Sequence, residues 1–275
     1  KPEIILALGD LKDPSAIDPL LDILEDSGED PTWRRYACAS LGKIADPSVL
    51  PNIKEILFEE DAIMRSYAVG ALRYFDTAEI NPLLISALKD SFWRVRVSAA
   101  QGLGEKKVEE AVPILIFKAE KDPENNVREE AVQALGEIAN QPALEALRKL
   151  YGSDLTPMVL RVSAAEILAE KDLEQSLVIF RQVIDKHWGK KDSRILERTA
   201  FILSITSSAT LSVSLQSFYS RFLDSGDIVI MIYGIRGIER NNLQIMKEAV
   251  ENLAEEENHR SIRKAALSAL DTLNQ

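Results

Sequence analysis

The residues with which this sequence could do chemistry are few. It contains two histidines, His187 and His259, and one cysteine, Cys38. Neither histidine has a second histidine, a cysteine or a carboxylate at the spacing that a zinc or di-iron site requires, and one cysteine cannot form an intrachain disulfide. The serines between 204 and 212 lack the pattern of a nucleophile elbow. We therefore predict no catalytic residues, no metal site and no bound cofactor, and we expect that this stretch of chain is not an enzyme.

A series of evenly spaced arginines is the second candidate for chemistry, because guanidinium groups recognise carboxylates and phosphates. Each is followed three residues later by alanine, seven residues later by leucine, and then usually by glycine. The series comprises Arg34, Arg65, Arg96, Arg128, Arg161 and Arg263. We interpret it as structural, with each guanidinium pairing with a loop carboxylate or a capping carbonyl of a neighbouring repeat. Candidate partners are Asp30, Asp61 and Asp90.

Leu196 and Val229 stand at the arginine position in two degenerate copies, where we expect the loop pairing to change. With them, the anchors lie 31 to 35 residues apart, and extrapolation places one more at Lys1. Each period holds two amphipathic helical patterns, a shorter first helix and a second helix that carries the anchor. The sequence therefore predicts an all-α fold, a right-handed α-solenoid of about eight helical hairpins. We expect residues 1–275 to form one such array within a longer protein.

The segments 95–104 and 127–136 resemble HEAT repeats of the phycobilisome-lyase-like type, and the resemblance covers nearly the whole chain. It implies a superhelix of stacked helix pairs whose second helices line the concave side. It does not imply one activity, because such repeats occur in scaffolds, lyase subunits and nucleic-acid enzymes. The HEAT-repeat hydroxylases are expected to carry His-Glu pairs on facing helices, and this sequence has no His-Glu dipeptide.

The second helices offer one surface, here called the second-helix stripe, made of the positions two, five and nine after each anchor. The stripe begins with aromatic residues, continues with acidic and amide residues and ends with apolar residues. Its candidate partner-binding residues are Tyr36, Tyr67, Tyr74, Gln101, Glu105, Glu130, Gln133, Glu137, Glu166, Glu170, Phe201 and Met231. This order fits a groove for a basic or amphipathic segment of another protein. The alternative is a solvated acidic middle with a buried apolar end.

The charge balance bears on the choice of partner. Lysine and arginine number 33 against 44 aspartates and glutamates, and the net charge of −11 disfavours binding to nucleic acid. A basic stretch from Arg181 to Arg194, with Trp188 among the cations, could contact phosphate, but we interpret it as a solvated loop. No apolar run of about 20 residues predicts a membrane span, and the cytoplasm is favoured.

These observations lead to one hypothesis and two alternatives. We expect a non-catalytic scaffold or adaptor that binds a protein partner along the face formed by the second helices. The alternatives are a bilin-lyase-like subunit and a HEAT-like nucleic-acid-binding protein.

Overall fold

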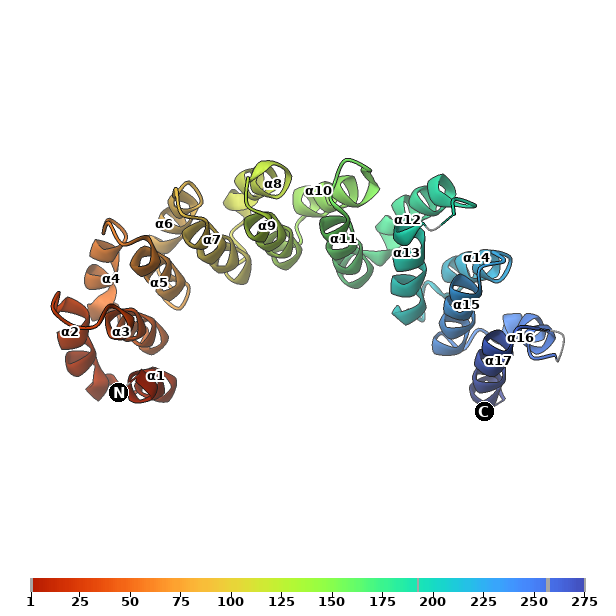
Figure 1. Cartoon of the computed structure of the whole chain (residues 1–275), viewed down its shortest axis with the longest axis horizontal. Coiled ribbons are helices and arrows are strands. Elements are labelled where there is room, and N and C mark those ends of the chain that lie inside the picture. The colour runs from red at the N-terminus through yellow and green to blue at the C-terminus, as the bar shows by residue number, and fades with distance from the viewer. Residues whose placement is uncertain (1, 192, 256–257, 275) are drawn as a thin grey trace. The chain divides into compact units, whose positions relative to one another are not determined.

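The computed structural model describes residues 2–191, 193–255 and 258–274, and all the regular structure in these ranges is helical. The helices follow one another as antiparallel hairpins (Figure 1). The predicted all-α architecture of stacked helical hairpins is confirmed, while Lys1, the extrapolated first anchor, lies outside the described residues. The chain divides into two compact units, Lys1–Ala143 and Leu144–Gln275. Among the described helices, none is both long and apolar enough to cross a membrane.

Unit 1 consists of two layers of helices (Figure 1). Each second helix packs on the second helix of the next repeat, in the order α1, α3, α5, α7 and α9, so these form one layer and the first helices form the other. The second helices are α1 (Pro2–Leu11), α3 (Pro31–Ile44), α5 (Ala62–Leu72), α7 (Trp93–Glu105) and α9 (Asn125–Ile138). The first helices are α2 (Ile17–Glu25), α4 (Leu50–Ile56), α6 (Ile80–Ala87) and α8 (Val112–Lys121).

Unit 2 repeats this arrangement, and α11, α13, α15 and α17 pack on one another in turn. Its second helices are α11 (Met158–Lys171), α13 (Arg194–Ile205), α15 (Ile228–Arg240) and α17 (Arg260–Leu273). The first helices are α10 (Gln141–Gly152), α12 (Leu173–His187), α14 (Ser212–Leu223) and α16 (Lys247–Leu253).

Aspartate and proline set the starts of the helices. Asp13 and Asp46 each accept a hydrogen bond from the backbone N–H of the serine two residues later, at 2.9 and 2.8 Å. Each precedes a proline, which has no backbone N–H and so leaves no donor without an acceptor in the first turn. The resulting 3-10 turns lead into α2 and α4. The 3-10 turns are η1 (Pro14–Ala16), η2 (Pro47–Val49), η3 (Glu109–Ala111) and η4 (Gln244–Met246).

The anchor arginines are structural, as predicted. Arg65 donates two hydrogen bonds to the Asp90 carboxylate, both of 2.9 Å, and Arg96 donates two to Asp122, of 2.9 and 2.7 Å. Each carboxylate lies in the loop of the following hairpin, so each pair links two successive repeats. The side chain of Asp122 is 0% exposed. Burial acts to raise its pKa, but the hydrogen bonds from Arg96, Glu124 N and Lys118 together with the Arg96 charge keep the pKa below the ordinary value.

The prediction for Asp30 and Asp61 is wrong, since neither pairs with an anchor arginine. Both stand immediately before a second helix, where a carboxylate can accept from the free N–H groups of the first turn. Asp30 accepts from Thr32 N at 2.7 Å, and Asp61 accepts from Ile63 N at 2.8 Å and also pairs with Arg35. Three other anchors donate to carbonyl oxygens of the first helix of their own hairpin, not of a neighbouring repeat. Arg34 donates to the Leu24 carbonyl, Arg128 to the Ala119 carbonyl and Arg161 to the Tyr151 carbonyl.

A polar network joins side chains in the degenerate part of unit 2, at the C-terminal end of α13. The change of loop pairing at Leu196 and Val229 stays a prediction. The buried hydroxyl of Tyr219 donates to the Leu203 carbonyl at 2.8 Å. The amide of Asn241 donates to the Tyr219 hydroxyl at 3.1 Å and to the Thr206 carbonyl at 3.0 Å. An amide and a phenol therefore satisfy carbonyl oxygens at the C-terminal end of α13.

Close approach between successive second helices depends on the glycine eight residues after the anchor. A Cβ atom on Gly42 would lie 2.5 Å from Ala71 Cβ, and one on Gly104 would lie 2.7 Å from Ala134 Cα. In the repeat that has Arg73 at this position, the residue opposite it is Gly102, and a Cβ atom added to Gly102 would lie 3.4 Å from Arg73 Cβ. The glycine eight residues after the anchor lies inside the helix and permits contact between backbones.

Substitution of Gly104 with alanine tests this contact. We expect Gly104→Ala to destabilise the fold by about 1–3 kcal/mol, because the new methyl group meets the backbone of α9 and overpacks the interface. The matched control is Gly70→Ala, whose Cβ would find its nearest neighbour at 3.9 Å and which should stabilise by about 0.5–1 kcal/mol through helix propensity. Urea denaturation followed by circular dichroism measures both; equal stability of the two variants would contradict the proposed contact.

Removal of the Asp122 carboxylate tests the link between repeats. Asp122→Ala leaves the buried Arg96 guanidinium without its partner, and we expect a loss of about 3–5 kcal/mol. Glu79 pairs with Lys54 at the surface, and Glu79→Ala should cost less than about 1 kcal/mol. If denaturant unfolding shows that both substitutions lower the free energy of unfolding by the same amount, the Arg96–Asp122 pair does not link the repeats as described.

Candidate functional site

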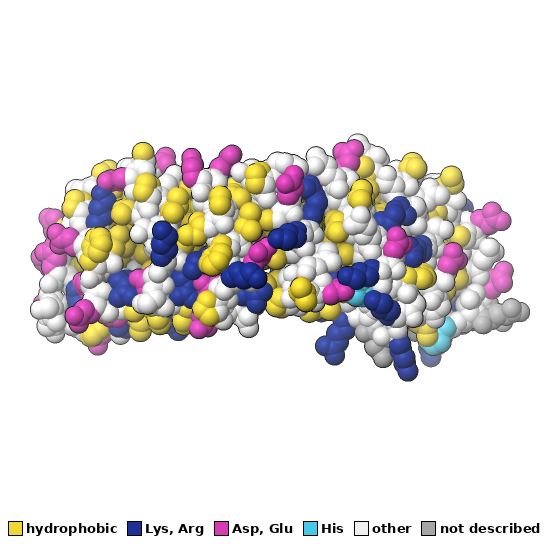
Figure 2. All heavy atoms as spheres, turned by 90° about the horizontal axis from the view of Figure 1, so that it is seen from above, with side chains coloured by type: hydrophobic (Ala, Val, Ile, Leu, Met, Phe, Trp, Pro, Cys, Tyr) yellow, Lys and Arg dark blue, Asp and Glu magenta, His cyan; other side chains and the backbone are white. Residues whose placement is uncertain are grey.

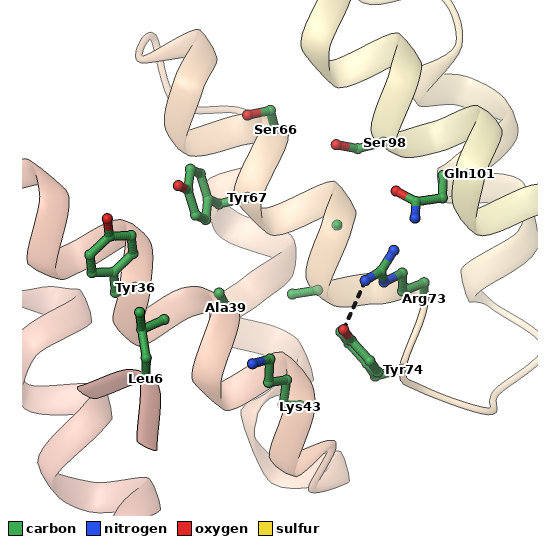
Figure 3. Close-up of a pocket in the computed structure, with 12 residues that line it drawn as sticks. Leu6, Tyr36, Ala39, Lys43, Ser66, Tyr67, Arg73, Tyr74, Ser98 and Gln101 are labelled. Atoms are coloured by element: carbon green, nitrogen blue, oxygen red, sulfur yellow. Dashed lines mark hydrogen bonds between the residues drawn. The ribbon is translucent and has the colours of Figure 1, made fainter. Parts of the chain in front are cut away.

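The second helices of unit 1 line an open groove of about 400 Å³, here called the tyrosine groove (Figure 3). This volume lies within the range of ligand and peptide sites. Most of its residues occupy the positions two, five and nine after an anchor, so the second-helix stripe and the groove largely coincide. The lining residues are Leu6, Tyr36, Ala39, Lys43, Ser66, Tyr67, Gly70, Ala71, Arg73, Tyr74, Ser98 and Gln101.

Three tyrosines give the groove its aromatic character. The rings of Tyr36 on α3 and Tyr67 on α5 lie with centroids 6.4 Å apart and planes tilted by 58°, so they form a ridged wall rather than a stack. Tyr74 directly follows α5, and its hydroxyl accepts a hydrogen bond from Arg73 at 2.9 Å (Figure 3). Tyr36 and Tyr67 are half-buried, while 38% of Tyr74 is exposed. Rings held in this way offer large contact area with little loss of side-chain entropy on binding.

Small residues form the floor between these rings. Ala39 and Gly70 stand five residues after their anchors, and Ala71 is the residue on which Gly42 packs. A larger side chain at any of these positions would fill the space. The depth of the groove therefore follows from the same small-residue contacts that bring the second helices together.

An acidic cluster borders the groove on the side of α7. The Glu105 carboxylate accepts hydrogen bonds from Arg73 and from Gln101, each of 3.1 Å. Glu130 on α9 is half-buried, and burial together with the nearby Glu105 charge raises its pKa above the ordinary value. Two carboxylates thus share one guanidinium, which leaves this end of the groove negatively charged.

The other candidate residues lie away from the groove. Gln133 and Glu137 are exposed on α9, and Glu166 and Glu170 are exposed on α11 of unit 2. Phe201 on α13 packs edge-on against Tyr233 at 5.6 Å, and both it and Met231 on α15 are half-buried. The structure brings Tyr36, Tyr67, Tyr74 and Gln101 into one groove and places Glu105 and Glu130 beside it. That these residues bind a partner stays a prediction.

Sequence reasoning missed several lining residues because they fall outside the chosen positions. Arg73 stands eight residues after its anchor, where other repeats have glycine, and Ser66 and Ala71 stand one and six residues after it. The replacement of glycine by arginine in this one repeat was the feature of the sequence that could have indicated a role for Arg73 in the groove. Its meaning depends on the facing Gly102, which only the packing reveals.

The basic stretch from Arg181 to Arg194 is only partly a loop, which corrects the sequence interpretation. Its first half forms the end of α12, and Arg194 begins α13. Asp154 accepts from Lys186 at 2.7 Å, from Arg161 at 2.9 Å and lies 3.2 Å from His187 Nε2, and these contacts hold its pKa well below the ordinary value. The ring of Trp188 lies under the Arg221 guanidinium at 4.4 Å. Within this stretch, Lys186 is therefore paired with a carboxylate of unit 2.

The remaining reactive side chains serve the fold. Cys38 is fully buried, as predicted for a small core residue, and burial raises its pKa to about 12. The Nδ1 atom of His187 lies 3.2 Å from the hydroxyl of Ser193, and His259 caps α17 by accepting from Ser261 N. In the part of the chain that the structure describes, no group of three His, Cys, Asp or Glu side chains could hold a metal ion. The described residues do not include the His-Glu pairs on facing helices that are expected of HEAT-repeat hydroxylases.

Figure 2 shows hydrophobic, basic and acidic side chains interspersed on the face of the molecule that it draws. Large exposed apolar side chains on the first-helix side of unit 1 include Phe58 and Phe117.

Comparison with known proteins places these features in a family. The model described as Spirochaete HEAT repeat protein matches residues 1–269. Deoxyhypusine hydroxylase of Drosophila melanogaster is 22% identical over 232 residues, which cover 74% of this chain and 74% of the relative. The same enzyme of Bos taurus is 28% identical over 206 residues, covering 54% of this chain and 68% of the relative. The X-ray structure of the Escherichia coli protein YibA covers 99% of this chain and 96% of its own, with a TM-score of 0.62 and 16% identity.

These relatives correct one prediction. The sequence led us to expect that the chain is not an enzyme, and that expectation is wrong, because relatives that match most of the chain include hydroxylases, which are enzymes. The prediction failed because it rested on searching for known arrangements of catalytic residues. Repeat architecture is shared between catalytic and binding proteins and does not separate them.

The raised pKa of Glu130 predicts a pH-dependent stability. Because the folded state favours the protonated carboxyl, this group stabilises the fold below the unfolded pKa of about 4.3, and that contribution is lost as the pH rises through the folded pKa. Glu130→Gln should therefore raise the melting temperature by about 1–2 °C at pH 7 and leave it unchanged at pH 3.5. Glu137→Gln, an exposed residue of the same helix, is the control and should have no effect at either pH. Equal melting temperatures of the two variants at pH 7 would contradict the proposal that the ionised Glu130 carboxylate destabilises the fold.

Proposed function

We propose that this chain, which belongs to the Spirochaete HEAT repeat protein family, binds a segment of another protein along the second-helix face of unit 1. The observation that carries the proposal is the tyrosine groove. Residues at equivalent positions of successive repeats line it, so the groove runs across repeats rather than between the two helices of one hairpin. A site of this kind suits an extended ligand that contacts several repeats in turn.

The chemistry of the lining supports a peptide as the ligand. Tyrosine and arginine are the residue types that contribute most at protein interfaces, and the groove holds three tyrosines and Arg73. Its hydroxyls and the Gln101 amide can exchange hydrogen bonds with a peptide backbone. The acidic cluster at Glu105 and Glu130 favours a partner with positive charge.

Charge reversal on α9 tests the proposal. We expect the double variant Glu130→Lys/Glu137→Lys to lose at least about tenfold in affinity for the protein partner, because it reverses one charge beside the groove and a second on the exposed face of the same helix. The matched control is Glu55→Lys/Glu110→Lys, which reverses two exposed carboxylates on the first-helix side of the same unit. The partner is captured from a native lysate with the wild-type chain, identified and purified, and its affinity is measured by calorimetry with all three proteins.

A partner that binds the α9 variant and the wild type equally would contradict the proposal. Capture of nucleic acid, with an affinity that falls steeply with salt, would favour the nucleic-acid-binding alternative instead. Loss of binding in the Glu55/Glu110 control alone would place the interface on the first helices.

A further inference from the structure

We infer that the tyrosine groove binds a proline-rich segment in the polyproline II conformation, with a lysine or arginine that reaches the Glu105 and Glu130 carboxylates. This inference rests on the proposed function and specifies its ligand. Three features of the groove carry it: the arrangement of the rings, the supply of hydrogen-bond donors and the distribution of charge.

The ridged aromatic wall fits a ligand with projecting rings. Tyr36 and Tyr67 lie with centroids 6.4 Å apart and planes tilted by 58°, as rings in contact do, so together they present an uneven aromatic surface above the small residues of the floor. Proline side chains are compact, rigid and apolar, and aromatic-lined grooves are the surfaces that recognise polyproline II segments. A flat aromatic ligand would require parallel rings on which to stack.

The repeat spacing matches the polyproline II period. This conformation rises about 3.1 Å per residue with three residues per turn, roughly 9.3 Å per turn. Packed helices stand about 8–10 Å apart, so a segment crossing α3, α5 and α7 would present equivalent residues to successive repeats. An α-helical ligand, with a pitch of about 5.4 Å, would not keep this register.

The groove supplies donors that a polyproline II backbone can use. Figure 3 shows the Tyr36 and Tyr67 hydroxyls and the Gln101 amide on the groove side of their helices. A polyproline II segment has no internal hydrogen bonds, so its carbonyl oxygens are available to accept. Proline also lacks the N–H group that would otherwise be buried without a partner. A helical ligand would already have used most of its carbonyls.

The charges select a cation rather than an anion next to the proline core. Lys43 pairs with Asp10 and Arg73 pairs with Glu105, so both basic groups of the lining are already compensated. Glu130 is half-buried and is repelled by the Glu105 charge, and the cation that offsets this repulsion is Arg73, which Glu105 already engages. A lysine or arginine of the ligand would relieve this repulsion, whereas an acidic residue would increase it.

Fluorescence polarisation with synthetic peptides and the whole chain tests the inference. The probe is a fluorescein-labelled peptide of three Pro-Pro-Leu repeats followed by Arg-Arg, about three polyproline II turns and a basic end. We expect a Kd of about 10–100 µM. Replacing every proline by alanine, or Arg-Arg by Glu-Glu, should weaken binding at least about tenfold, because the first change removes the preformed conformation and the second reverses the charge.

Variants of the protein locate the site. Tyr67→Ala should weaken binding about tenfold, and Tyr67→Phe, which keeps the ring and the packing, should weaken it about threefold to fivefold. Glu105→Gln/Glu130→Gln should abolish the preference for Arg-Arg over Glu-Glu. Phe117→Ala, which removes an exposed aromatic residue on the first-helix side, should bind as the wild type does. Circular dichroism establishes that each variant is folded.

Failure of the wild type to bind the probe below about 1 mM would overturn the inference, as would equal binding of the alanine peptide or an unchanged Kd for both Tyr67 variants. Such a failure is distinct from failure of the proposed function. A protein partner that still depends on Glu130 and Glu137 while the peptide does not bind would leave the proposed function standing with a ligand of another conformation.

Discussion

The structure of unit 1 depends on how closely successive second helices approach each other. Gly42 and Gly104 place backbone against backbone. Where Arg73 stands in place of this glycine, the residue that faces it on the next helix is Gly102, so the small residue lies on the other side of the contact. This constraint brings the side chains of neighbouring repeats within reach of each other. Without it, Tyr36 and Tyr67 would not share one wall, and the Arg73 guanidinium would not reach from α5 to the Glu105 carboxylate on α7.

The anchor arginines complement this contact at the other end of each hairpin. A guanidinium has a planar set of donors that matches a carboxylate, so the Arg65 and Arg96 pairs define both distance and orientation between repeats. Buried pairs of this kind add less to net stability than their geometry suggests, because both charges lose their hydration. Their main effect here is to specify how one repeat sits on the next.

The same packing creates a surface whose chemistry can vary without changing the fold. Positions that face the next helix are restricted to small residues, whereas positions of the second-helix stripe tolerate tyrosine, glutamine, glutamate or phenylalanine. This separation explains how relatives with the same architecture include hydroxylases. In this chain, the described residues bring tyrosines and carboxylates together in unit 1.

The sequence by itself determined the helical repeat, its period and the structural role of the arginines, because these follow from local periodicity and from residues that recur at fixed spacing. It also identified Tyr36, Tyr67, Tyr74 and Gln101, since one helical face can be read from positions three and four residues apart. Only the tertiary structure decided that these residues share a groove with Arg73 and Ser66, and that burial and the Glu105 charge together raise the pKa of Glu130. Such contacts join residues about 25 to 35 positions apart, and their partners depend on the packing distance between helices, which no local pattern encodes.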